Sequence, residues 1–376
     1  MALINYLVPV QFDFGAVRLL PAELQRLSVR RPLLVTDRGL MQSGAWARIV
    51  PHLPPLEAGR IYDATPENPT EAAVAAAAKM YVAQGCDGIV AIGGGSPLDL
   101  AKGAALLATH SGPLDPFAVV AGGMERITAA VAPVIAVPTT SGTGSEVGRA
   151  AVIVMNDGRK LAVVSPHLLP RSAICDPELT LTLPPRLTAG TGMDAIAHCV
   201  ETFLSAAQNP PADAIALDGL ARAVTHLPRS CASGDDRAAR SEMMMASLQG
   251  GLAFQKGLGA VHAMSHPLGA LRSPTIHHGT ANAILLPAVL RYNEPACTGK
   301  YTRMRAVLGL APDADLANFF EALTRQIGLP TRLSAVGVHR DLLPQLAESA
   351  AQDFSSRTNP RPVDARAYER LYRESL

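Results

Sequence analysis

The chain has 376 residues, of which 48% are hydrophobic, 17% charged and 4% aromatic, and its formal net charge is +1. The balanced charge and the scarcity of aromatic rings exclude a broad binding surface for nucleic acid or an anionic membrane, so we expect a small-molecule partner, no nucleic acid and no membrane. The length suits two domains, each large enough for its own core.

From residue 31 to about 180 the sequence alternates between strand and helix patterns. Strands are expected at 32–37, 60–63, 87–93, 132–138 and near 173–175, with helices through about residue 49 and from 69 to about 83. Asn156-Asp-Gly158 predicts a hairpin turn between strands at 150–155 and 160–164. Short apolar strands that alternate with helices are typical of a parallel sheet. The pattern predicts an α/β domain over residues 1–180.

The second half of the chain, residues 181–376, changes to long helical patterns with Ala, Leu and Met on one face, interrupted by Pro and Gly. This periodicity predicts an all-α domain. The boundary between the two domains is expected near residue 180.

The cysteines and the N-terminus favour a cytoplasmic protein. Five cysteines are scattered along the chain without a Cys-x-x-Cys pair: Cys86, Cys175, Cys199, Cys231 and Cys297. This pattern is typical neither of a disulfide framework nor of a zinc knuckle. The first residues lack the basic and apolar regions of a secretory signal, and no run of 18 residues is purely apolar.

Two loops that follow strands are candidates for binding a nucleotide. Residues 93–102 contain three consecutive glycines and lead into a helix, for which Ser96 is the expected N-cap and Pro97 the first helical residue. A helix N-terminus can bind a pyrophosphate, although a tight strand-to-helix turn is an equally simple interpretation. The second loop, 138–146, is rich in hydroxyl groups and would lie at the same edge of the sheet, where ligands of such folds bind.

Asp37 ends an expected strand and also has two interpretations. Its carboxylate could accept hydrogen bonds from a ribose and repel a 2′-phosphate, which would favour NAD over NADP. It could instead be the N-cap of the following helix.

A group of histidines in the second half predicts a metal site. Asp194 and His198 are four residues apart on an expected helix, and His262 and His266 repeat this spacing, so each pair lies on one helix face. A carboxylate and neutral imidazoles suit Zn²⁺ or Fe²⁺ and leave room for a substrate oxygen. Each of these residues alone could be an ordinary core residue, but together with His277-His278 they favour a catalytic metal.

With these motifs, the sequence resembles the iron-containing alcohol dehydrogenases over nearly its whole length. The resemblance rests on residues 93–102, 138–146, 176–179, 191–198 and 257–269. It implies an α/β nucleotide-binding domain, an all-α metal-binding domain of the dehydroquinate synthase-like type, and an active site in the cleft between them. It also implies NAD, one divalent metal (Fe²⁺ first, Zn²⁺ as the alternative) and a homo-oligomer, most simply a dimer.

The resemblance also assigns residues. The implied metal ligands are Asp194, His198, His262 and His278, with His277 as a second candidate because the preceding loop is longer than is usual in the family. His266 is implied to lie near the substrate and the nicotinamide, where it could relay the alcohol proton. The implied cofactor contacts are Asp37, Gly94, Gly95, Ser96, Asp99, Thr139, Thr140, Thr143, Lys160 and Leu179.

A narrower resemblance concerns the substrate. Residues 175–181, 209–213, 253–259 and 277–280 look like the bacterial 4-hydroxybutyrate dehydrogenases within this family. An ω-hydroxy acid needs a cation for its carboxylate, and Lys256 is the candidate, with Arg149 and Arg272 as alternatives. A solvated lysine at a helix end is the simpler interpretation of Lys256.

Three other functions remain open at this stage. The chain could be an alcohol dehydrogenase or aldehyde reductase of broad specificity. It could be a metal-dependent hydrolase, or a lyase of the dehydroquinate synthase type, which would cause no net change in nicotinamide absorbance. It could also be a catalytically silent nucleotide-binding protein, which would retain no metal.

Overall fold

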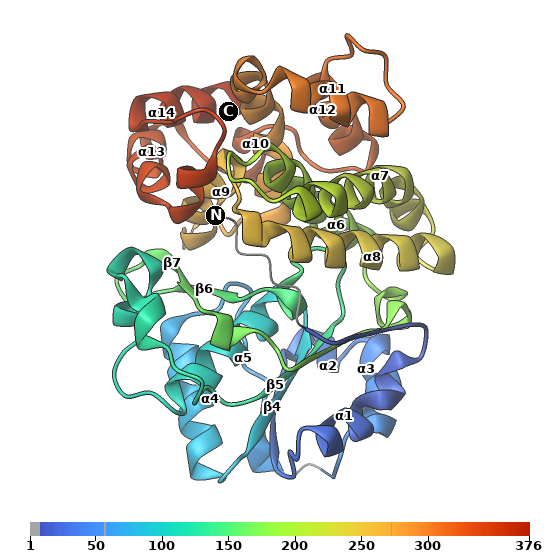
Figure 1. Ribbon diagram of the computed structural model, residues 1–376, viewed down its shortest axis with the longest axis vertical. Helices are drawn as coiled ribbons and strands as arrows, with labels where there is room; N and C mark the ends of the chain where they lie inside the picture. The colour runs from blue at the N-terminus through green and yellow to red at the C-terminus, as the bar shows by residue number, and fades with distance from the viewer. Residues whose placement is uncertain (1–7, 56–57, 272) are drawn as a thin grey trace. The chain divides into compact units, whose positions relative to one another are not determined.

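The computed structural model describes residues 8–55, 58–271 and 273–376. The chain forms two compact units. The α/β unit comprises residues 8–140 and Gly144–Thr182, and the helical unit comprises Ser141–Thr143 and Leu183–Leu376. Figure 1 shows the first in blue to green and the second in yellow-green to red.

The α/β unit contains a six-stranded, fully parallel sheet in the order β1-β8-β5-β4-β2-β3. Its strands are β1 (Val10–Phe12), β2 (Pro32–Val35), β3 (Ile61–Tyr62), β4 (Gly88–Gly93), β5 (Val134–Pro138) and β8 (Ser172–Cys175). The expected hairpin forms a separate antiparallel pair, β6 (Ala150–Val154) and β7 (Lys160–Val164). The predicted α/β class is confirmed, although β1 was not among the expected strands.

Helices cover both faces of the sheet because alternate residues of each strand point to opposite sides. Leu33 and Val35 of β2 join the core beneath α4 (Glu71–Ala83) and α5 (Gly95–Leu107). Leu34, between them, joins the opposite core. That second core also contains residues of α1 (Leu20–Arg26) and α3 (Gly44–Ile49).

Two helices of this unit, α2 (Arg38–Met41) and α4, begin with a side-chain cap. Thr70 Oγ1 accepts a hydrogen bond from the Ala73 N–H and caps α4. Asp37 caps the short α2 by accepting from the Leu40 N–H at 2.8 Å. The expected Ser96 cap is wrong, because α5 begins two residues earlier, at Gly95, with Gly94 as its N-cap. Ser96 therefore lies inside the first turn, and its hydroxyl donates to the Glu67 carbonyl.

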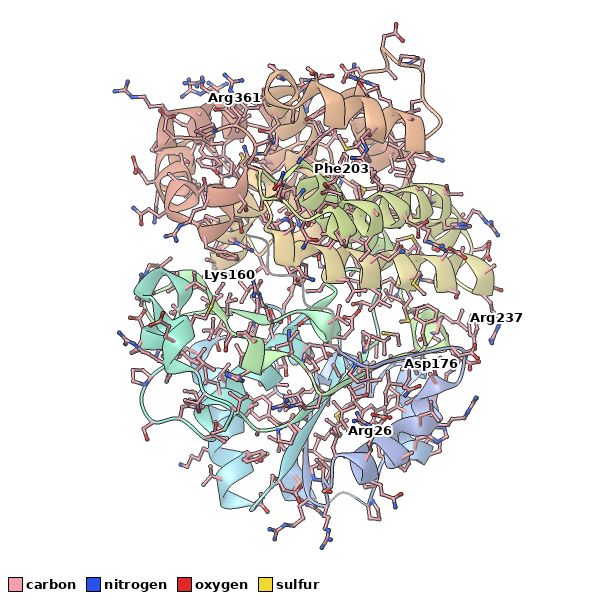
Figure 2. The ribbon with its side chains drawn as sticks, in the orientation of Figure 1. Arg26, Lys160, Asp176, Phe203, Arg237 and Arg361 are labelled. Atoms are coloured by element: carbon pink, nitrogen blue, oxygen red, sulfur yellow. The ribbon has the colours of Figure 1, made fainter. Side chains whose placement is uncertain are left out.

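Asp176, labelled in Figure 2, joins the end of β8 to the segment that follows β1. Its carboxylate accepts hydrogen bonds from the N–H groups of Gly15 at 3.0 Å, Val17 at 3.1 Å and Glu178 at 3.0 Å. The motif at 176–179 thus has a structural role, since Asp176 holds two short helical turns together.

The helical unit confirms the predicted all-α class. Its helices are α6 (Pro185–Leu204), α7 (Pro210–Ala232), α8 (Arg237–Ala253), α9 (Ala260–Ala270), α10 (His278–Asn293), α11 (Thr298–Val307), α12 (Leu316–Gln326), α13 (Leu343–Gln352) and α14 (Ala365–Glu374). The buried α6 contacts α7, α8 and α10. Among the described residues, no helix combines the length and the apolar character needed to cross a membrane.

Glycines allow α6 and α10 to approach each other very closely. A Cβ atom on Gly279 would stand 2.0 Å from the carbonyl oxygen of Gly190 and 3.2 Å from Cβ of Asp194. No side chain fits at such a distance, so the contact requires glycine at this position. This close approach brings the first turn of α10 next to the middle of α6.

Candidate metal centre

The middle of α6 presents three ionisable side chains on one face. Asp194, His198 and Glu201 are separated by one helical turn each and are all buried. The helical repeat explains this alignment, because residues four and seven apart fall on the same side of a helix. Glu201 was not singled out from the sequence.

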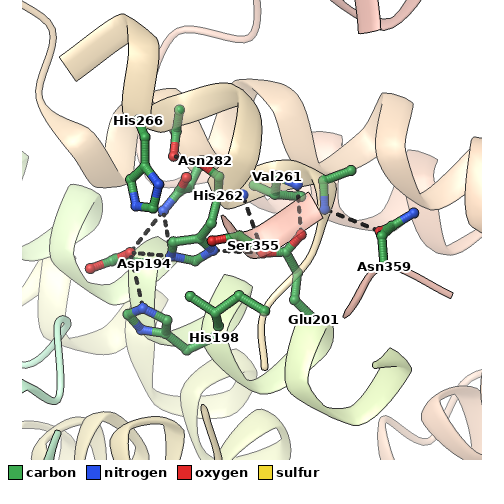
Figure 3. A network of polar contacts seen from close by, with 12 residues as sticks. Asp194, His198, Glu201, Val261, His262, His266, Asn282, Ser355 and Asn359 are labelled. Carbon is green, nitrogen blue, oxygen red and sulfur yellow. Dashed lines mark hydrogen bonds and ion pairs between the residues drawn. The ribbon is translucent and has the colours of Figure 1, made fainter. Parts of the chain in front are cut away.

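Two further helices bring imidazoles to Asp194. Its Oδ1 atom lies 3.5 Å from Nε2 of His262 on α9, 3.6 Å from Nε2 of His278 on α10 and 3.9 Å from Nε2 of His198. The rings of His198 and His262 stack with centroids 4.6 Å apart. The structure therefore brings together the four residues predicted as ligands, and Figure 3 shows His198 and His262 beside the carboxylate of Asp194.

Hydrogen bonds on the outer side of the rings orient the Nε2 atoms inward. Nδ1 of His198 lies 3.3 Å from the carbonyl oxygen of Gly142, and Nδ1 of His262 lies 2.6 Å from Oε2 of Glu201. Both acceptors require a proton on Nδ1, so in the neutral ring the lone pair lies on Nε2. This arrangement is the usual one for metal-binding imidazoles.

Asn282 completes the centre from one turn further along α10. Its amide nitrogen lies 2.8 Å from Oδ1 of Asp194, 3.4 Å from Nε2 of His262 and 3.3 Å from Nε2 of His278. Its buried Oδ1 atom has no hydrogen-bond partner among the residues that the structure describes. One carboxylate oxygen and three imidazole nitrogens fit a divalent transition metal.

The electrostatics of the group favour a cation. Burial raises the pKa of Asp194, but the surrounding imidazoles, first His198 and then His278, outweigh burial and hold that pKa below its usual range. Burial lowers the pKa of His198 to about 4. Burial also lowers the pKa of His262, but hydrogen bonds with Asp194 and Glu201 outweigh it and raise the pKa to about 9. The negative carboxylates thus attract positive charge to this point.

His266 lies beside the centre with its own carboxylate partner. Its Nδ1 atom is 2.9 Å from Oδ2 of Asp353, a residue that also caps the 3-10 helix Phe354–Thr358. The His266 ring stacks on His278, with centroids 5.6 Å apart. With Nδ1 engaged, Nε2 is the position at which His266 could exchange a proton.

From the sequence, His277 is a second candidate metal ligand, and Arg272 is an alternative cation for a substrate carboxylate. The His277 ring lies against Gly190, so that a Cβ on that glycine would be 2.7 Å from Nδ1. Among the described residues, the side chains close enough to share one cation are Asp194, His262 and His278, without His277 and also without His198, whose Nε2 lies 3.9 Å from Oδ1 of Asp194. Arg272 lies outside the described residues.

Several of the predicted cofactor residues lie at one edge of the α/β sheet. The Thr139 N–H donates to the Gly93 carbonyl at 2.9 Å, and a Cβ on Gly94 would lie 3.4 Å from Thr140. Asp37 follows β2, which is the neighbour of β4. The glycine loop and the hydroxyl loop therefore adjoin, as expected from the strand order.

Other members of that predicted set make contacts other than those between the two loops. The ammonium of Lys160 donates to Asn68 at 2.8 Å, and Leu179 is buried in a short helix after β8. Ser96 bonds to the backbone within the unit. Thr143 belongs to the segment Ser141–Thr143 of the helical unit. A cofactor role for these residues stays a prediction.

The carboxylate of Asp99 is fully engaged inside the α/β unit. It accepts hydrogen bonds from Ser145 Oγ at 2.5 Å and from the Val152 N–H at 2.9 Å. The buried ammonium of Lys102 donates to Ser145 Oγ at 2.7 Å and to the Ala150 carbonyl at 2.8 Å. These contacts tie the helix after the glycine loop to the hydroxyl loop, so Asp99 supports both loops.

Lys256 caps the C-terminus of α6 together with Lys300. The Lys256 ammonium is buried, donates to the Phe203 carbonyl at 3.2 Å and forms an ion pair with Asp213. Lys300 donates to the carbonyl oxygens of Leu204 at 3.2 Å and Ser205 at 2.7 Å. Cations at a helix C-terminus stabilise its dipole and satisfy its last carbonyls. Binding of a substrate carboxylate by Lys256 stays a prediction that none of these contacts supports.

Replacing Lys256 with Met should lower the free energy of unfolding by about 3 kcal/mol, because it leaves Asp213 without its buried partner. Urea denaturation followed by circular dichroism measures the change. Lys79→Met, at an exposed position of α4, should change it by less than about 0.5 kcal/mol. Unchanged stability of the Lys256 variant, with a KM that rises only for carboxylate-bearing substrates, would instead favour the predicted role in substrate binding.

Both halves of the chain match known sequence families. Residues 9–177 match the family described as iron-containing alcohol dehydrogenase, and residues 188–376 match the C-terminal domain of the Fe-containing alcohol dehydrogenase family. A curated 4-hydroxybutyrate dehydrogenase from Cupriavidus necator is 52% identical, and the alignment covers 100% of both chains.

Solved structures agree with this sequence similarity. A 1,3-propanediol oxidoreductase is 36% identical over 100% of both chains, with a TM-score of 0.91. A sulfoacetaldehyde reductase from Bifidobacterium kashiwanohense, solved in complex with NAD⁺, is 27% identical with a TM-score of 0.86 and covers 100% of this chain and 99% of its own.

Proposed function

Since the chain belongs to the iron-containing alcohol dehydrogenase family, we propose that it interconverts 4-hydroxybutyrate and succinic semialdehyde with NAD. The coarser activity, a metal-dependent and NAD-dependent alcohol dehydrogenase, follows from family membership. The observation that carries the proposal is the convergence of three imidazole Nε2 atoms on the buried carboxylate of Asp194. The similarity to the Cupriavidus necator enzyme supports the finer choice of substrate.

The proposed metal ligands are Asp194, His198, His262 and His278, with Fe²⁺ as the first choice of metal and Zn²⁺ as the alternative. A divalent ion at this place supplies Lewis acidity to an alcohol or aldehyde oxygen. The protein's part is to fix which ring nitrogen of His198 and of His262 carries the proton. The bonds from His198 to Gly142 and from His262 to Glu201 serve that purpose.

We assign proton transfer to His266. Its Nδ1 atom is held by Asp353, so Nε2 is available to take a proton from the alcohol and return it to the aldehyde. The balanced reaction is R–CH₂OH + NAD⁺ to R–CHO + NADH + H⁺, in which the cofactor accepts the hydride. The predicted cofactor contacts at Asp37, Gly94 and Thr139 lie along neighbouring strands, which supports their assignment to NAD.

Two alternatives receive less support. A lyase of the dehydroquinate synthase type is not favoured, because both halves match dehydrogenase families. A dehydrogenase of broad specificity would use the same centre, and only substrate comparison separates it from the proposal. We further propose that the enzyme acts in the cytoplasm as a homodimer; the five reduced cysteines are consistent with that compartment.

The substrate proposal is tested by NADH oxidation with three aldehydes of matched length. Succinic semialdehyde should show a kcat/KM about 30-fold above those of butanal and of methyl 4-oxobutanoate, because one charge-assisted contact to a carboxylate contributes about 2 kcal/mol. The methyl ester has the same chain without the charge and is the matched control. Equal values for the three aldehydes would contradict the narrow substrate and leave the family activity unaffected.

A further inference from the structure

The N-terminus of α9, the helix that carries His262, is capped by side chains remote in sequence. Its N-cap residue is Gly259, which has no side chain to accept a hydrogen bond. The N–H of Ala260 donates to Asn359 Oδ1 at 3.1 Å, and the N–H of Val261 donates to Glu201 Oε1 at 2.6 Å. Figure 3 shows Glu201 and Asn359 side by side at this helix end. The usual local cap is thus replaced by two buried side chains from other parts of the unit.

Glu201 also makes two contacts with His262. Its Oε2 atom accepts from the backbone N–H of His262 at 3.2 Å and from the Nδ1–H of the same residue's ring at 2.6 Å. The backbone and the imidazole of His262 are therefore held by one carboxylate. The Glu201 side chain is itself buried, 2% exposed, so water does not compete for these bonds.

The chain leaves space for this carboxylate. A Cβ on Gly259 would stand 2.8 Å from Glu201 Oε1 and 2.9 Å from Asn359 Oδ1. Any ordinary N-cap residue would therefore push the two remote side chains away. Glycine at this position is better explained by the approach of Glu201 than by its own weak capping ability.

We propose that Glu201 is the positioning residue that prepares His262 to bind the metal, an inference that rests on the proposed metal-dependent function. By holding the proton on Nδ1, the carboxylate fixes the tautomer that presents the Nε2 lone pair toward Asp194. By bonding to the backbone of α9, it also fixes the position from which the ring extends. Its negative charge adds to that of Asp194 and balances a divalent cation.

Glu201→Gln keeps the size of the side chain and removes its negative charge. The amide oxygen of glutamine can still accept from the Val261 N–H, but its NH₂ group cannot accept from the ring of His262. We expect the variant to bind Zn²⁺ about 10- to 100-fold more weakly than the parent, the usual effect of losing a carboxylate behind a metal-binding histidine. Competition with a chromogenic chelator on the metal-free full-length protein measures this affinity, and no turnover is required.

Asn359→Ala is the matched control. It removes the other cap of the same helix end, at Ala260, and leaves the ring of His262 untouched. Its Zn²⁺ affinity should stay within about threefold of the parent even if its unfolding temperature falls. Equal losses of Zn²⁺ affinity in the two variants would mean that the affinity depends only on the capping of α9. An unchanged affinity in Glu201→Gln would mean that the carboxylate does not affect metal binding. Either result overturns the proposal.

A spectroscopic measurement keeps the test decisive if Glu201→Gln does not fold. In the zinc-loaded parent, ¹⁵N-histidine labelling should reveal a downfield, slowly exchanging proton on Nδ1 of His262, because that proton lies between the ring and a buried carboxylate. A zinc-loaded parent that lacks this resonance overturns the proposal. Failure of the parent itself to bind Zn²⁺ or Fe²⁺ would contradict the proposed function instead.

Discussion

Replacing Asp194 with Ala should lower kcat by about a thousandfold or more, which corresponds to several kcal/mol of lost transition-state stabilisation. Within the described part of the chain, Asp194 is the only carboxylate that contacts Nε2 of all three proposed imidazole ligands. Without it, the carboxylate left beside these rings is Glu201, which contacts the outer side of His262 and cannot hold a divalent ion between the rings. The metal content after gel filtration, measured by plasma emission spectroscopy, should fall to background. The affinity for NADH, measured by fluorescence, should stay within about twofold if the cofactor is bound by the α/β unit.

Asp218→Ala is the control for this variant. Asp218 lies on α7 in a surface pair with Arg222, which contributes at most about 1 kcal/mol. Its loss should leave metal content and turnover as they are. Full turnover with a stoichiometric metal in the Asp194 variant would rule out the proposed centre.

Replacing Gly279 with Ala should have the second largest effect on metal content and on stability. The new Cβ would overlap the Gly190 carbonyl oxygen, 2.0 Å away, so α6 and α10 would have to separate by more than 1 Å to reach ordinary contact. His278 is the neighbour of Gly279 and would move away from Asp194. We expect Gly279→Ala to lose most of its metal and about 2 to 3 kcal/mol of stability, the usual cost of overpacking a close contact.

Gly299→Ala is the matched substitution in a helix of the same unit. A Cβ at this position of α11 would meet nothing within 4 Å, so no atom has to move. The exchange should raise stability slightly, since alanine is the better helix former by up to about 1 kcal/mol. Equal metal content and equal unfolding temperatures in the two variants would contradict the role assigned to the α6 and α10 contact.

Much of the fold was predictable because its elements follow strong local rules. The apolar runs of β4 and β5 are fully buried strands, and the Asn-Asp-Gly turn specified the hairpin between β6 and β7. Strand β1 was missed because three half-buried residues are too short to show a period. The strand order also could not be read from local patterns, since it depends on contacts between residues far apart, such as Val10 with Ala173.

The site was predictable where it followed the helical repeat. Asp194 and His198 on α6, and His262 and His266 on α9, were recognised as pairs four residues apart. Glu201 continues the same face of α6, so a search that extended to the next turn would have found it. Asn282 stands in the same relation to His278.

Other features of the site had no local signal. Asp353 is 87 residues from His266, and nothing in its own segment indicates that the two meet. Lys256 was interpreted by its charge, yet its partners are the end of α6 and Asp213, which no spacing rule connects to it. Ser96 fitted the composition of an N-cap but lies one residue inside the helix. In each case a contact between distant segments decided the outcome.

The position of Gly142 in the sequence matters for chimeras made by joining halves of related chains. The Gly142 carbonyl, which holds His198, comes from a short segment inside the first half of the chain, although it belongs to the helical unit. A fragment produced from Leu183 onward would lack it, and so would a chimera whose first half carries a different loop at 141–143. Breakpoints placed at the junction near residue 182 would therefore separate the helical unit from one of its own segments.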